Sequence, residues 1–134
     1  MKKLLKITAL SLAMLMMVLT LASCGAPNKD PAKAKAALEE NGYIVTLKDG
    51  KLVEIVASAL GIDDLDAQIV AVSKEDIDDY ITIYYFETKD AANAAWEKIE
   101  KEADEKMKDE EDVVLKKSGT MIYYGSKNAV KAAK

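Results

Sequence analysis

The sequence predicts an α+β fold in which helices pack on an antiparallel sheet. Runs with helical spacing of apolar residues alternate with short β-rich runs, and a chain of 134 residues suffices for one domain. From residue 31 the expected order is helix, strand, helix, strand, strand, helix, strand, strand, helix. Its middle matches the β-α-β-β-α-β order of a ferredoxin-like (split βαβ) fold. We therefore expect helices on one face of the sheet, with an added hairpin strand and terminal helices.

The first predicted helix begins at Asp30-Pro31, where an N-cap carboxylate precedes a proline in the first turn. Asn41-Gly42 is typical of a helix end. Tyr43 to Leu47 is rich in residues that favour strands, so it is the first predicted strand.

The segment after this strand has two interpretations. Asp49-Gly50 between apolar runs favours a hairpin turn. However, the apolar residues over 52–60 recur at helical spacing, and Gly61 stands where a C-terminal cap belongs. Because the helical pattern has more matches, we predict a short helix from Leu52 to Leu60.

The second half of the chain contains the longest predicted helix, Lys89 to Lys108, which Thr88 or Asp90 begins. Ser126 caps a last short helix that ends at Lys134. The remaining predicted strands are Ala67 to Ser73, Tyr80 to Glu87, Val113 to Lys117 and Thr120 to Tyr124.

The composition excludes several classes of function. The chain has no histidine and no arginine, and all 19 basic residues are lysine. Without histidine, the usual general base and a Ser-His-Asp arrangement are excluded, and the commonest zinc ligand is absent. Without arginine, an acidic chain is a poor nucleic-acid binder. We expect no enzyme activity, no cofactor and no nucleic-acid partner.

The N-terminus has the features of a secretory signal peptide. Three lysines precede an apolar run over 7–21, and small residues follow. Leu21-Ala22-Ser23-Cys24 resembles the lipobox of bacterial lipoproteins, and Cys24 is the only cysteine. The resemblance implies that the Cys24 thiol receives a diacylglyceryl group. It also implies that signal peptidase II cleaves between Ser23 and Cys24.

These features divide the chain into a signal peptide (1–23), a lipidated cysteine with a short tether (24–30) and a small α+β domain (31–134). The expected location is the cell membrane, with lipid on Cys24 as the anchor on the extracytoplasmic face. Residues 24–134 carry a formal charge of −7, from −4 minus the three lysines of the leader. We expect this acidic domain to stand off anionic lipid. An uncleaved membrane helix, or a plain signal peptide with an incidental cysteine, are the alternatives.

The strand from Tyr80 predicts a partner surface. Alternation places aliphatic side chains on one face, which should meet the helices. The other face would carry aromatic rings with hydroxyl tips, which suit contact with a protein partner at the cell surface. Tyr123 or Tyr124 would join from another strand. Alternatively, a terminal helix covers this face and its rings are core. The candidate surface is Tyr80, Thr82, Tyr84 and Phe86.

Two acidic clusters support the alternative function, a calcium-binding or carboxylate-based enzymatic module. One is Asp63, Asp64 and Asp66; the other lies within 74–79. Neither matches the spacing of an EF-hand loop, so no metal ligands are assigned. Solvated acidic loops are the simpler interpretation.

The expected function is therefore a binding or accessory role for a membrane-anchored lipoprotein. The domain resembles small uncharacterised lipoproteins of low-GC Gram-positive bacteria. Tyr84-Tyr85-Phe86-Glu87 before a helix and Tyr123-Tyr124-Gly125 near the end carry this resemblance. It implies no particular activity.

Overall fold

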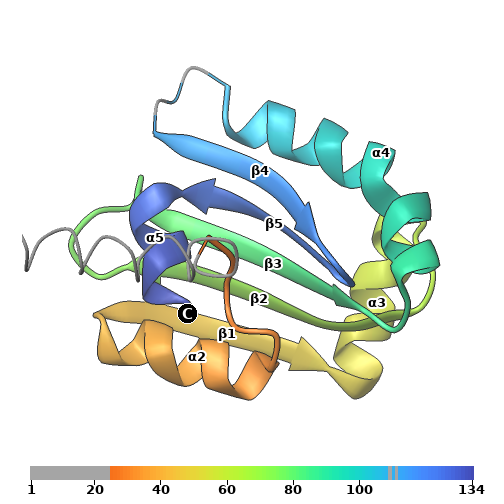
Figure 1. The fold of residues 1–134 in the computed structure, drawn as a ribbon, viewed down its shortest axis with the longest axis horizontal. Helices are drawn as coiled ribbons and strands as arrows, with labels where there is room; N and C mark the ends of the chain where they lie inside the picture. The colour runs from red at the N-terminus through yellow and green to blue at the C-terminus, as the bar shows by residue number, and fades with distance from the viewer. Residues whose placement is uncertain (1–24, 109, 111) are drawn as a thin grey trace, which may run out of the picture.

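The computed structural model describes residues 25–134, apart from 109 and 111 (Figure 1). Helices and strands alternate in the predicted order, which confirms the α+β class. Within the described residues, the elements are α2 (Pro31–Glu40), β1 (Tyr43–Asp49), α3 (Gly50–Leu60), β2 (Leu65–Ser73), β3 (Tyr80–Phe86), α4 (Lys89–Lys106), β4 (Val113–Ser118), β5 (Met121–Ser126) and α5 (Lys127–Ala132).

The strands form one antiparallel sheet in the order β1-β2-β3-β5-β4. β3, α4 and β4 make a split βαβ unit, because β5 lies between the two strands and pairs with both. β1 and β2 are direct antiparallel neighbours although α3 connects them. The ferredoxin-like order is therefore wrong for this half of the sheet. Gly61 in the left-handed region (φ 71°) ends α3, and the loop after it leads into β2, which pairs with β1 from Asp49 to Tyr43.

Helices α2 and α5 cover one face of the sheet. Their apolar residues Leu38 and Val130 belong to the same cluster as the aliphatic side of β3. Figure 1 shows α5 crossing in front of the sheet and α2 running along its β1 edge. This first core consists of Ala34, Leu38, Tyr43, Ala67, Ile69, Ala71, Ile81, Ile83, Tyr85, Met121, Tyr123, Ala129, Val130 and Ala133.

Helices α3 and α4 cover the opposite face, so the expectation of helices on one face is wrong. Alternate residues of β3 send their aromatic side chains to this side. The reason is visible in the strand itself. All side chains from Ile81 to Phe86 are buried, as in a strand covered on both faces. This second core consists of Val53, Ile62, Leu65, Tyr84, Phe86, Ala91, Ala92, Ala95, Ile99, Ala103, Ile122 and Tyr124.

The helix starts follow the capping residues that the sequence predicts. The side chains of Asp30, Thr88 and Ser126 each accept a hydrogen bond from a backbone N–H in the first turn of their helix. The helical interpretation of the segment after β1 is confirmed, since α3 occupies it. Boundaries move by a few residues: α4 ends at Lys106 and β5 continues to Ser126.

Gly125 is required where β3 and β5 approach each other. A Cβ atom at this position would lie 2.2 Å from the carbonyl oxygen of Tyr80 and 2.6 Å from the Cα of Ile81. Gly125→Ala should therefore lower the free energy of unfolding by about 1–3 kcal/mol, measured by urea denaturation. Gly25→Ala is the matched control, because nothing lies within 4 Å of its Cβ position. Equal stability of the two variants would contradict the close approach.

Candidate functional site

A groove lies between α3 and α4 on the second face of the sheet. α3 packs on β1 and β2, whereas α4 packs on β3, β4 and β5. The gap between the two helices leaves a hollow of about 370 Å³ over the middle strands, which we call the α3–α4 groove. Its lining residues are Lys48, Ile55, Val56, Ala59, Leu60, Gln68, Val70, Thr82, Tyr84, Glu102, Lys106 and Tyr124.

Two tyrosine hydroxyls converge on one carboxylate in this groove. Tyr84 on β3 and Tyr124 on β5 both donate hydrogen bonds to Oε2 of Glu102, at 2.7 and 2.5 Å. Glu102 lies on α4 three residues after buried Ile99, a spacing that places both on the side of the helix facing the sheet. Both tyrosine rings are fully buried, and only their hydroxyl ends meet the carboxylate. Hydrogen bonds to a charged acceptor are stronger than neutral ones, so the three groups hold one another in place.

The two tyrosines are held in the protonated form. Burial raises the pKa of Tyr84 well above its ordinary value, and the hydrogen bond to Glu102 raises it further. The same two causes raise the pKa of Tyr124. The nearby polar side chains of Gln68 and Thr82 lower the pKa of Tyr84 and of Tyr124, respectively, but more weakly. At neutral pH both hydroxyls therefore serve as hydrogen-bond donors.

Gln68 leaves an acceptor without a partner. Its side chain is buried in the sheet and lines the groove, and its Oε1 atom has no hydrogen-bond partner among the described residues. A buried carbonyl oxygen without a donor is costly, and native proteins rarely leave one. Because the tyrosine hydroxyls already donate to Glu102, they do not satisfy the Oε1 atom of Gln68. The floor of the groove therefore presents a hydrogen-bond acceptor that a ligand could satisfy.

The walls of the groove are apolar and its rim is basic. On α3, Ile55 is 66% exposed although it is a large aliphatic residue, and Val70 on β2 is 40% exposed. Lys48 and Lys106 stand at the rim. The groove thus combines an apolar wall with a polar floor, which is typical of a site that binds the body of a ligand and orients one end.

The predicted partner surface is wrong as an exposed aromatic face. Tyr84, Phe86 and Thr82 are buried, and Tyr80 is half-buried with a hydroxyl that lacks a partner. The prediction that these residues share one face of the sheet is confirmed, but α3 and α4 cover that face instead of leaving it exposed. Thr82 and Tyr84 are at the floor of the groove, whereas Phe86 is core.

Sequence reasoning missed two groups of the groove. Glu102 lies in a dense charge run on α4, where the only signal for an inward carboxylate is its position three residues after the apolar Ile99. Gln68 lies directly opposite Tyr84 across β2 and β3, a neighbour that only the register reveals. Of Tyr123 and Tyr124, the two candidates to join the tyrosines of β3, Tyr124 does so through Glu102, whereas Tyr123 belongs to the first core.

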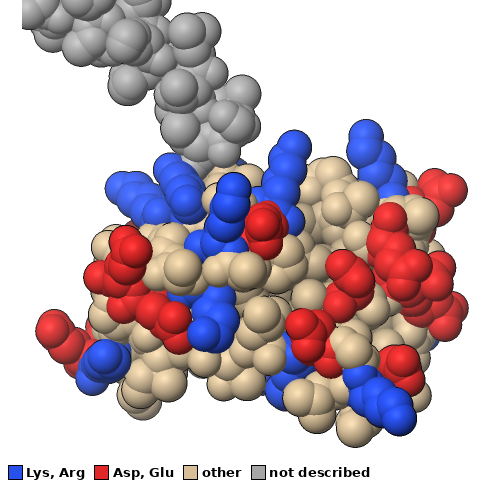
Figure 2. Space-filling view, turned by 90° about the horizontal axis from the view of Figure 1, so that it is seen from below, with Lys and Arg blue, Asp and Glu red and all other residues tan. Residues whose placement is uncertain are grey.

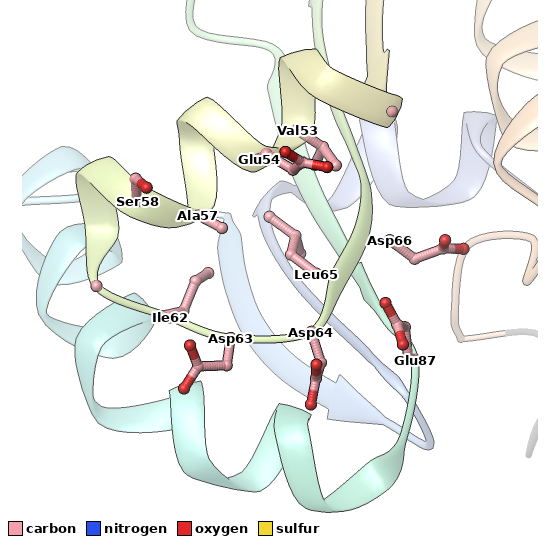
Figure 3. A pocket seen from close by; sticks show the side chains of 12 residues that line it. Val53, Glu54, Ala57, Ser58, Ile62, Asp63, Asp64, Leu65, Asp66 and Glu87 are labelled. Atoms are coloured by element: carbon pink, nitrogen blue, oxygen red, sulfur yellow. The ribbon is translucent and has the colours of Figure 1, made fainter.

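The first acidic cluster lines a separate hollow of about 620 Å³ between α3 and the start of β2 (Figure 3). Figure 3 shows Asp63 and Asp64 on one side of the loop, while Asp66 points away from them. Among residues 25–134, without 109 and 111, no three acidic or thiol side chains are close enough to hold a metal ion. This arrangement gives the calcium alternative no support.

The second acidic cluster contains a structural carboxylate. Asp79 accepts hydrogen bonds from the Tyr43 hydroxyl at 2.8 Å and from the Ser126 hydroxyl at 2.6 Å. It thereby ties the loop before β3 to β1 and to the start of α5. Burial, followed by the hydrogen bond to Asp79, raises the pKa of Tyr43. Asp76 accepts a backbone hydrogen bond from Asp78 within the same loop.

Ser23 and Cys24, the predicted cleavage and lipidation residues, lie outside the described residues. Comparison of the chain with protein-family models, curated proteins and solved structures finds no match. The functional interpretation therefore depends on the geometry of this molecule and on the leader sequence.

The tyrosine environment predicts the alkaline behaviour of the protein. All six tyrosines have a pKa above the ordinary 10.0. Their contribution to stability is therefore complete below pH 10 and is lost as the pH rises through the folded-state values. We expect tyrosinate absorbance near pH 10 to be much weaker in the native protein than in the unfolded chain.

A variant of Glu102 tests how much of the rise in tyrosine pKa comes from the groove. Glu102→Gln removes the carboxylate, so the pKa of Tyr84 and Tyr124 falls and tyrosinate appears at lower pH than in the parent protein. Glu97→Gln, at an exposed position on the same helix, should leave the titration unchanged. Superimposable curves for all three proteins would contradict the tyrosine–carboxylate network.

Proposed function

We propose that this chain is a lipid-anchored extracytoplasmic binding protein whose ligand occupies the α3–α4 groove. The observation that carries the binding part is the unpartnered Gln68 oxygen, which lines the same groove as the Glu102 carboxylate and its apolar walls. The leader with Leu21-Ala22-Ser23-Cys24 supports the location.

The anchor, not a membrane-spanning helix of the domain, would hold the protein at the membrane. No helix in the described part of the chain is both long and apolar enough to span a bilayer. A diacylglyceryl group at Cys24 supplies two acyl chains, and two chains are enough for stable anchoring.

Binding suits the groove better than catalysis does. A tyrosine that acts as a base or nucleophile needs a lowered pKa, whereas burial and Glu102 raise that of Tyr84 and Tyr124. The chain contains no histidine to supply a base near neutral pH. The groups of the groove are thus arranged to hold a ligand without reacting with it.

The direction of the hydrogen bonds indicates the chemistry of the ligand. The tyrosine hydroxyls already donate their hydrogen bonds to Glu102, and the Oε1 atom of Gln68 is a free acceptor among the described residues. A ligand that completes this floor must bring donors, and a protonated amine brings three beside a carboxylate. The apolar wall around Ile55 suits a hydrocarbon body. We therefore assign the groove to a ligand with an ammonium group on an apolar chain.

Replacing the lipidation residue tests the location. Cys24→Ser removes the thiol that accepts the lipid, so the variant should keep its leader and its intact mass should lack the diacylglyceryl increment. Mass spectrometry of the protein from its native membranes measures both properties. Ser23→Ala, which keeps a small residue before the cysteine, is the control and should be processed normally. A native product with a bare Cys24 would contradict the proposed anchor.

Titration with small amines tests the groove. Hexylammonium should perturb the tyrosine signals in two-dimensional NMR and raise the melting temperature, whereas hexanoate should do neither. Glu102→Gln or Gln68→Leu should weaken amine binding roughly 10- to 100-fold, which corresponds to the about 1.5–3 kcal/mol of a hydrogen bond to a charged group. Glu97→Gln is the control, because Glu97 is exposed and does not line the groove.

Two results would overturn this assignment. Hexanoate would bind through the rim lysines, so tighter binding of hexanoate than of hexylammonium would reverse the proposed charge of the ligand. Unchanged amine affinity in both groove variants would place the binding elsewhere on the molecule.

A further inference from the structure

The segment that follows Cys24 is part of the folded domain. Pro27 is buried, and the backbone N–H of Asn28 donates to the carbonyl oxygen of Ala133 at 2.8 Å. The hydroxyls of Tyr85 and Tyr123 donate to the carbonyl oxygens of Asn28 and Gly25, at 2.9 and 3.1 Å. The expected tether is therefore fastened to the first face of the sheet from its second residue onward.

Lysines surround the point at which this segment begins. A hollow of about 240 Å³ next to Gly25 has an apolar floor of Val114 and Val130. Its other lining residues form what we call the lysine face: Lys116, Lys127, Lys131 and Lys134. β4 contributes the first of these, and α5 and its C-terminal end contribute the others. All four are exposed.

Among the described residues, the lysine face makes few ion pairs. The ion pair found at this face in the described part of the chain joins Lys127 to Asp112 at 3.9 Å, and both side chains are largely exposed. Such an exposed pair contributes little. Figure 2, seen from the side of α2 and β1, shows several lysine side chains along the upper edge, with carboxylates between them and toward both ends.

We propose that the lysine face lies against the anionic headgroups of the bilayer that holds the lipid anchor. The proposal rests on lipidation of Cys24. That residue is one peptide bond from Gly25, so its Cα would lie about 3.8 Å from the Gly25 Cα, and the lipid on its sulfur would enter the bilayer close to the lysine face. The four ammonium groups would then lie within reach of headgroup charge, which extends about 8 Å at physiological ionic strength.

This orientation has a consequence for the α3–α4 groove. The lysine face and the fastened segment are on the side of α2 and α5, whereas the groove is on the side of α3 and α4. With the lysine face on the membrane, the sheet separates the groove from the bilayer, and the groove opens toward the extracytoplasmic space.

Lysine footprinting of the lipidated protein tests this contact. The mature protein is placed in vesicles of phosphatidylcholine alone or mixed with phosphatidylglycerol, and amine acetylation is followed by mass spectrometry. Acetylation of the lysine face should be severalfold slower in the anionic vesicles, and high salt should remove the difference. Lys51 and Lys101, exposed on α3 and α4, should react equally in both.

Matched variants distinguish charge contact from simple proximity. Lys131→Glu with Lys134→Glu should abolish the protection of Lys116 and Lys127, whereas Lys51→Glu with Lys101→Glu should preserve it. Equal acetylation in both kinds of vesicle, with a lipid-bearing Cys24 in the intact mass, would overturn the membrane contact alone. A Cys24 without lipid would overturn the proposed anchor. The intact mass therefore tests the anchor and the acetylation tests the membrane contact, both in the same sample.

Discussion

The burial of β3 on both faces is the constraint on which the other elements depend. Successive side chains of a strand point to opposite sides, so Ile81, Ile83 and Tyr85 build one core and Tyr84 and Phe86 build the other. A shift of one residue in its pairing with β2 or β5 would exchange the two sets. Neither pair of helices would then meet the side chains that fit it. Gly125 allows β5 to pair closely with β3, because the backbone of β3 occupies the space that a side chain at position 125 would need.

Two pairs of adjacent tyrosines connect the cores to the surface. In Tyr84-Tyr85 and in Tyr123-Tyr124, one ring of each pair lies in each core. On the first face the hydroxyls bind backbone carbonyls of the segment after Cys24, and on the second they bind Glu102. A tyrosine ring fills a core while its hydroxyl reaches a polar partner at the edge. The same residue type therefore fastens the N-terminal segment on one side and shapes the groove on the other.

The distribution of charge matters more than its sum. The chain has a formal charge of −4, and an acidic domain is repelled by anionic lipid at a distance. Close to a surface, screening limits each charge to its neighbourhood, so the local composition decides the contact. Carboxylates line the hollow of Figure 3, whereas lysines surround Gly25. The expectation of a domain that stands off the membrane follows from the sum, and the proposed contact follows from the arrangement.

The sequence by itself determined the features that depend on neighbouring residues. Caps such as Asp30 and Ser126, the periodicity of α3 and the pattern around Cys24 are local, and the helices begin where these caps predict. The tertiary structure decided which strands pair, which face each helix covers, and that Gln68, Tyr84 and Glu102 meet in one groove. These relations join residues far apart in the chain. Their outcome depends on packing the whole sheet, because the two faces of β3 are both apolar and strand periodicity does not say which helices cover which.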